Sequence, residues 1–214
     1  MIPIRDENPS STTPYMNYAL IIINAVAFLL TLLTPDPNAV IDKYGLRPAD
    51  VVAGTGLVTF LTSMFLHGGL LHIGGNMLFL YIFGDNIEDT MGHAGYVIFY
   101  LAAGVAGSLA HIASDPNSTI VAIGASGAIS GVLGAYVRYF PNARIRTAVT
   151  LGFWIQFVKI PAYLMIGFWF FYQLLLAILD LGGGVAYFAH IGGFIAGLAL
   201  ALIIPRRKRS EWPA

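Results

Sequence analysis

Long apolar runs that carry no charge dominate this chain. The stretches without Asp, Glu, Lys or Arg cover 8–35, 51–84, 90–114, 116–137, 147–158, 160–179 and 181–205. Most of them can hold an apolar helix of about 20 residues, the length that crosses the hydrocarbon core of a bilayer. The pattern therefore predicts an all-α membrane protein.

Breaks in the pattern divide it into six membrane-spanning helices. Proline lacks an N–H donor and disfavours helix in the residue before it, so Pro35, Pro141 and Pro205 each end a run. We expect helices at about 15–33, 69–90, 94–113, 126–140, 161–179 and 186–204.

The segments outside these helices complete the predicted organisation. Residues 35–66 are expected to form a long outer connection. Its second half, 51–66, is apolar but interrupted by glycine, so we expect it in or on the outer leaflet rather than as a seventh span. Residues 142–160 are expected to form a basic cytoplasmic connection. The six-helix domain, 15–205, would lie between a short N-terminal segment, 1–14, and a basic tail, 206–214.

Composition agrees with this picture and adds an orientation. Of the 214 residues, 57% are hydrophobic and 10% are charged, whereas roughly 25% are charged in soluble domains. Nine of the eleven Lys and Arg residues fall on one predicted side, and Lys43 and Arg47 on the other. Because basic residues favour the cytoplasmic side, we expect a multi-pass protein of the plasma or inner membrane with both termini cytoplasmic.

The sequence does not favour nucleic-acid binding or thiol chemistry. The run RRKR at 206–209 directly follows a span, so we interpret it as a topology anchor rather than a nucleic-acid patch. The chain contains no cysteine, which excludes thiol chemistry.

A few polar side chains interrupt the predicted helices, where hydrocarbon makes them costly. His72 and Asn76 are four residues apart and share one face of the second helix. Ser126 begins the fourth helix, and His190 lies in the sixth. Each of these residues needs a structural or chemical reason.

Counting from the helix ends places three of these residues at about one depth. Ser126 and His190 each lie fifteen residues before a proline, Pro141 or Pro205, which is about 22 Å at 1.5 Å per residue. Asn76 lies sixteen residues before Gly92, which places it close to the same depth if the second helix reaches that glycine. A helix of that length falls short of the roughly 30 Å core, so the amides at the start of the fourth helix predict a wet pocket.

Rows of small residues indicate which helices meet. Gly127 and Gly131 form one row on the fourth helix, and Gly193 and Gly197 form another on the sixth. Such rows let helices approach closely. The contact would bring the Ser126 hydroxyl to the His190 ring, a nucleophile beside a base, with His72 and Asn76 able to donate to an oxyanion.

Each feature also has a structural interpretation when taken singly. The tetrapeptide GASG can arise from packing, and Asn76 could tie helices together. A lone membrane histidine is commonly structural, and we interpret His93 and His111, near helix ends, in that way. The combination of Ser126 and His190 at one depth is what favours catalysis.

These motifs resemble those of the rhomboid family of intramembrane serine proteases. The segment HGGLLHIGGN contains the family's H-x-x-x-N, GASG its G-x-S-G, and AHIGGFIAG is similar to its A-H-x-x-G-x-x-x-G. They occur in the family's order on the second, fourth and sixth helices. The segment GDNIEDTMG, with Glu88 and Gly92, resembles the family's turn after the second helix. The resemblance covers about 58–205 and implies a six-helix core.

The resemblance also implies roles for individual residues. Ser126 would be the nucleophile and His190 the general base, while His72 and Asn76 would help form the oxyanion hole. Gly124 and Gly127 would shape the turn. The implied reaction is hydrolysis of single-pass transmembrane substrates in the lipid bilayer through an acyl-enzyme, without metal, cofactor or nucleic acid.

The chain departs from the family pattern at a few positions. Val58 and Thr59 stand where many members carry Trp-Arg. Ser130 stands where some members place an aromatic ring against the histidine, and a neighbouring helix could supply that ring instead. Asp115 and Asp180 fall in predicted outer loops, so we do not expect either to complete a triad.

Other functions remain open from the sequence. A non-catalytic rhomboid-like membrane-protein binder would have the same helices, although such relatives typically lack the serine or the histidine. A small-solute transporter would also suit a broken helix with polar groups, but the halves of this chain show no repeat. The fifth helix and the loop at 181–184 could be moving parts or ordinary lipid-facing surface.

Overall fold

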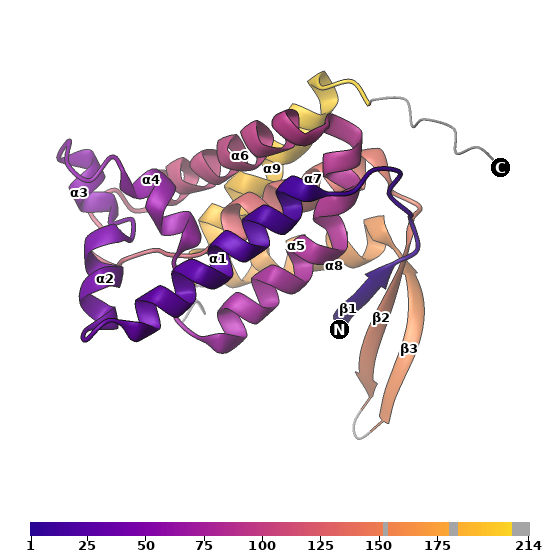
Figure 1. Ribbon diagram of the computed structural model, residues 1–214, viewed down its shortest axis with the longest axis horizontal. Coiled ribbons are helices and arrows are strands. Elements are labelled where there is room, and N and C mark those ends of the chain that lie inside the picture. Colours follow the sequence, from indigo (N-terminus) through magenta and orange to yellow (C-terminus); the bar gives the residue numbers. More distant parts are fainter. Residues whose placement is uncertain (152–153, 180–183, 207–214) are drawn as a thin grey trace.

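Six long helices make up most of the computed structural model, which describes residues 1–151, 154–179 and 184–206 (Figure 1). Within these residues the long helices are α1 (Tyr15–Leu33), α5 (Leu70–Met91), α6 (His93–Ser114), α7 (Ser126–Tyr139), α8 (Ala162–Ile178) and α9 (Tyr187–Ile203). Their ends agree with the predicted ends to within one residue. The loop at 181–183, Asp180 and the tail at 207–214 lie outside the described residues.

The helices differ in how well they suit a membrane. Among the described residues, α1 and α6 are long and apolar enough to cross a bilayer on their own. The pair Thr59–Phe65 and Leu70–Met91 would form a third span but is bent by 96° at its break. Helices α8 and α9 are apolar but have 17 residues each. Six crossings and cytoplasmic termini therefore stay predictions.

Residues 35–66 form short helices at the end of the bundle that lies at the left in Figure 1. These are α2 (Pro37–Tyr44), α3 (Pro48–Val52), α4 (Thr59–Thr62) and the 3-10 helix η1 (Ser63–Phe65). Leu46 and Ala122 exchange backbone hydrogen bonds of 2.9 and 2.8 Å. This segment is therefore fixed to the residues that lead into α7.

The structure is mostly helical as predicted, but it also contains a three-stranded antiparallel sheet that the all-α prediction lacked. Strands β1 (Ile2–Asp6), β2 (Arg144–Leu151) and β3 (Trp154–Pro161) pair in that order at the opposite end of the bundle (Figure 1). In β2, Ile145 and Thr147 are buried while Arg144 and Arg146 are exposed. That alternation is the period of a half-buried strand. The predicted connection at 142–160 is a hairpin, and the N-terminal segment is paired with it.

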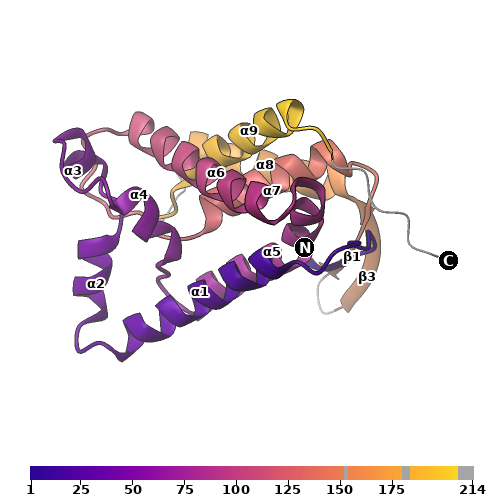
Figure 2. The same ribbon diagram turned by 45° about the horizontal axis from the view of Figure 1, so that its top comes forward.

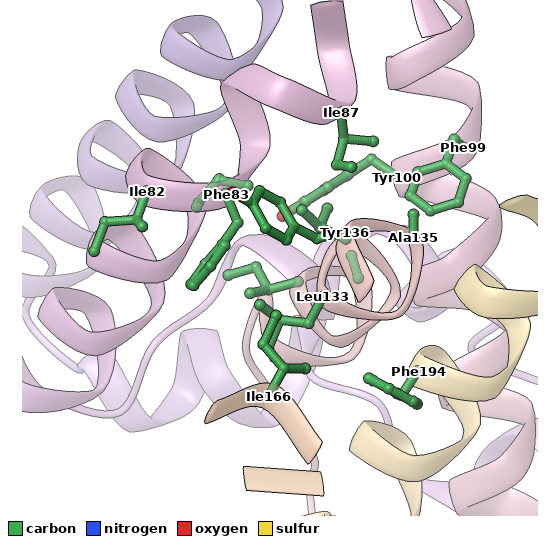
Figure 3. Close-up of a cluster of buried hydrophobic side chains, with 14 of the residues drawn as sticks. Ile82, Phe83, Ile87, Phe99, Tyr100, Leu133, Ala135, Tyr136, Ile166 and Phe194 are labelled. Atoms are coloured by element: carbon green, nitrogen blue, oxygen red, sulfur yellow. The ribbon is translucent and has the colours of Figure 1, made fainter. Parts of the chain in front are cut away.

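Helix α7 lies in the middle of the bundle and contacts α5, α6, α8 and α9 (Figure 2). It is short and buried on nearly all sides, which fits a helix without a polar face. Figure 3 shows Leu133 and Tyr136 of α7 among side chains of α5, α6 and α8, including Phe83, Tyr100 and Ile166. The residue that begins α7 is thereby held in a fixed position.

A buried carboxylate joins α1 to the turn between α5 and α6. Glu88 accepts hydrogen bonds from the backbone N–H groups of Met16 and Asn17, at 3.0 and 2.7 Å, and pairs with His93. The first N–H groups of a helix have no partner inside it, and a negative charge there is favourable. Gly92, which ends α5, has a φ of +77° that favours glycine. This turn therefore sets the position of α1.

Candidate active site

Ser126 and His190 are in direct contact. Ser126 is the first residue of α7, and His190 lies in the first turn of α9. The distance from Ser126 Oγ to His190 Nε2 is 2.7 Å. The serine hydroxyl can donate only to a ring nitrogen without a proton, and when it donates to Nε2 the proton of the neutral ring is on Nδ1.

Glycine makes this contact possible because α7 and α9 touch through their backbones. A Cβ added to Gly193 would meet the carbonyl oxygen of Gly127, and one added to Gly197 would meet the backbone of Gly131. These are the rows of small residues singled out in the sequence. Larger side chains would separate the two helices and with them the serine and the histidine.

The turn before α7 passes against two polar side chains of α5. Gly124 has a φ of +124°, where a side chain would be strained. A Cβ at this position would lie 2.7 Å from His72 Nε2 and 3.6 Å from Asn76 Nδ2. The N–H of Gly124 donates to the Ser63 carbonyl at 2.8 Å. His72 and Asn76 are thus brought to the same side of the chain that leads to Ser126.

A second histidine supports this pair. The Nε2 atom of His67 lies 2.9 Å from Asn76 Nδ2, and the two rings of His67 and His72 lie edge to face at 5.0 Å. The N–H of Gly68 donates to His72 Nδ1 at 3.4 Å, which leaves the Nε2 proton of His72 free to donate. His67 is 2% exposed. It begins the HGGLLH segment, but its position in the sequence predicts no role for it.

One cavity of about 740 Å³ is lined by Ser126, His190, His72 and Asn76. Its wall also includes residues 120–123 before α7 and residues 184–188 around the start of α9. His111, interpreted from the sequence as structural, lines this cavity as well. Ser126, His190 and Asn76, which the sequence predicts at one depth, therefore share one space with His72.

The other residues weighed in the sequence lie apart from the Ser126–His190 contact. Ser130 is 1% exposed, and its hydroxyl donates to the Ser126 carbonyl at 2.6 Å. Asp115 lines the cavity, but the nitrogen of His190 that an acidic residue would bind in a triad is bonded to Gln173. Gln173 was missed, although it is the only amide side chain in the apolar run at 160–179.

Aromatic rings surround His190 from two helices. The ring of Trp169 on α8 lies 6.1 Å from the His190 ring at an interplanar angle of 34°, and the ring of Tyr187 lies 6.1 Å away at 88°. These rings supply the packing that Ser130 cannot. Among the described residues, no group of three or more His, Cys, Asp or Glu is placed to hold a metal ion.

Comparison with known proteins bears on this site. Residues 54–207 match the family model described as the rhomboid domain. The mitochondrial rhomboid protein 1 of Saccharomyces cerevisiae is 31% identical over 204 residues, which is 91% of this chain and 54% of that protein. Rhomboid protease GluP of Bacillus subtilis is 31% identical over 208 residues, 94% of this chain and 36% of its own.

A third relative is named for its chemistry. Rhomboid-type serine protease 2 of Emericella nidulans is 30% identical over 152 residues, covering 69% of this chain and 27% of that protein. This chain spans about half or less of the length of each of these relatives.

Proposed function

This chain belongs to the rhomboid family, and from that premise we propose that it is an intramembrane serine protease. Its substrates would be single-pass transmembrane proteins, cleaved near the outer ends of their membrane segments. The observation that carries the proposal is the 2.7 Å hydrogen bond between Ser126 Oγ and His190 Nε2 beside a cavity. Relatives named as a rhomboid protease and as a rhomboid-type serine protease support the same chemistry.

The geometry supports acyl transfer in two stages. As Ser126 Oγ attacks the scissile carbonyl carbon, its proton passes to His190 Nε2, and the imidazolium then gives that proton to the leaving amine. An ester between Ser126 and the acyl fragment results. A water molecule, deprotonated by Nε2, then attacks the ester, and the proton returns to Ser126.

Negative charge on the carbonyl oxygen requires donors placed in advance. His72 would donate through Nε2 and Asn76 through Nδ2, beside Gly124. The hydrogen bond between Asn76 and His67 orients the amide. The backbone N–H of Ser126 is available too, because the first amides of a helix have no partner within it. Gly124 and Gly127 would contribute because they have no side chain: His72 and Asn76 can lie close to Gly124, and Ala189 of α9 can lie close to Gly127.

We place the whole core in the bilayer with six crossings. Helices α8 and α9 are short but apolar. Helix α9 packs beside the longer α6, and both α8 and α9 contact the central α7. The sheet and the basic residues near it lie at the end of the bundle that, by the distribution of Lys and Arg, would face the cytoplasm. In this arrangement residues 15–205 are the protease domain and both termini are cytoplasmic.

A fluorophosphonate probe together with a reporter transmembrane substrate tests the proposal. We expect the purified protein to be labelled and to cleave the reporter, and Ser126→Ala and His190→Ala to do neither. Ser130→Ala is the matched control, because Ser130 lies one turn away and faces the Ser126 carbonyl; it should retain both activities. A folded wild type that is neither labelled nor active would count against a protease and favour a non-catalytic binder.

A further inference from the structure

We propose that Gln173 is a third member of this site, a positioning residue that holds His190 in the tautomer able to take the serine proton. The inference rests on the proposed protease function. Gln173 Oε1 lies 2.8 Å from His190 Nδ1, on the side of the ring opposite Ser126. Gln173 is 8% exposed and lies on the apolar helix α8. A buried amide without a partner is costly, so this hydrogen bond accounts for its presence.

The amide oxygen selects one form of the ring. A carbonyl oxygen can only accept a hydrogen bond, so contact with Oε1 requires the proton on Nδ1. The Nε2 atom is then unprotonated and faces Ser126 Oγ at 2.7 Å. In the other tautomer Nε2 would carry the proton and could not act as the base. Gln173 therefore keeps the neutral histidine ready to react.

A neutral partner suits the surroundings of this site. In soluble serine proteases a carboxylate orients the histidine and stabilises the imidazolium. An ionised carboxylate within apolar helices is expensive, whereas an amide carbonyl provides the same orientation with a smaller electrostatic effect. When Ser126 transfers its proton, Nδ1–H still donates to Oε1, so the hydrogen bond persists through the reaction.

Helix α8 presents a second group to the same ring. Trp169 precedes Gln173 by four residues and shares its face, with its ring 6.1 Å from that of His190. Stacking of Phe170 on Phe194, at 4.3 Å, fixes α8 against α9. The histidine is thus held by a ring and an amide from one helix, and the site is complete only when α8 packs against α9.

Gln173→Leu removes the acceptor, and Gln173→Glu keeps an acceptor oxygen. We expect Gln173→Leu to lower kcat by roughly 10- to 100-fold, less than the roughly 100- to 10,000-fold attributed to the positioned base itself, with KM changed less than about 3-fold. Gln173→Glu should recover most of that loss. Met165→Leu is the matched control, since Met165 is buried two turns earlier on α8 and contacts Thr147 rather than the histidine.

The tautomer of His190 can also be measured directly. Nitrogen-15 NMR of the labelled His190 ring in the wild type should show a protonated Nδ1 and an unprotonated Nε2, and Gln173→Leu should shift the population toward the other form. A protonated Nε2 in the wild type, or an unchanged kcat in Gln173→Leu, overturns this inference. If the wild type and Ser126→Ala are equally inactive, the proposed protease function is what fails.

Discussion

Gly124 is the residue on which the proposed oxyanion site depends most directly. Its backbone combines a positive φ with close approach to His72 and Asn76. No L side chain suits both conditions, because the φ strains the backbone and the added carbon would lie against the His72 ring. The resemblance alone implied that this glycine shapes the turn, and the distances supply a physical reason.

Gly124→Ala is therefore expected to reduce turnover by about 10-fold or more, through displacement of donors to the oxyanion. Gly167→Ala on α8 provides the control, because nothing lies within 4 Å of a Cβ placed there. That change should leave turnover unaltered and raise stability by up to about 1 kcal/mol. Cleavage of the reporter substrate measures the first effect and thermal unfolding the second. Equal turnover in both variants would contradict the role given to this turn.

The polar residues at the site differ in how far sequence could reveal them. Ser126 and His190 stood out because a hydroxyl and an imidazole are costly in hydrocarbon and lie at matching distances from prolines. Gln173 and His67 gave weaker signals. Each is explained only by the neighbour it binds, His190 or Asn76, and that neighbour lies on another helix or across a bend.

At the scale of the elements, Glu88 shows how one side chain can position a helix. It is fully buried, and its carboxylate satisfies two N–H groups at the start of α1. Removing it leaves those donors and His93 without their charged partner. Loss of a buried, hydrogen-bonded ion in this way is strongly destabilising.

We expect Glu88→Ala to lower the free energy of unfolding by about 3 kcal/mol, seen as a fall in Tm in detergent. Glu7→Ala is the comparison. Glu7 pairs with Lys159 at 2.7 Å, but the lysine side chain is 62% exposed, and such surface pairs contribute at most about 1 kcal/mol. A similar Tm for the two variants would show that the Glu88 contacts do not stabilise α1.

Helices and strands were not equally predictable from this chain. The helix ends agreed to within one residue because apolar runs and prolines are local signals. The strands were not predicted, because their alternation of apolar and polar residues is short. The segment at 142–160 was interpreted only from its basic residues, as a connection. Their stability also depends on β1, which pairs Ile2 with Ala148 and Asp6 with Ile145 from a distant part of the chain. No window of neighbouring residues contains that pairing.

For the molecule as a whole, Asp6 links the N-terminal segment to the helical bundle. Its carboxylate accepts hydrogen bonds from Tyr136 at 2.7 Å and Asn86 at 2.8 Å. Burial raises the pKa of Asp6 from 3.8 to about 6; nearby Asp85 adds to the rise, while Tyr136 and Arg5 oppose it. The folded state therefore holds this proton more tightly than the unfolded state does.

The sign of the pH effect follows from that difference. The contribution of Asp6 to stability is fully present below its ordinary pKa and is lost as the pH rises through about 6. We expect β1 amides to exchange hydrogen more readily, after correction for intrinsic rates, as the pH increases from about 4 to 7. Asp6→Asn should remove this dependence. Increasing protection over that range, or the same slope in Asp6→Asn, would contradict the assignment.

The pairing of β1 with β2 also has a consequence for biosynthesis. Asp6 leaves the ribosome 138 residues before Arg144, the first residue of β2. At synthesis rates of about 5–20 residues per second, the interval is roughly 7–30 s. In that time α1, α5, α6 and α7 are translated while the first strand has no partner. Strand β1 thus acquires its partner late, and the sheet can close only after four of the long helices have been made.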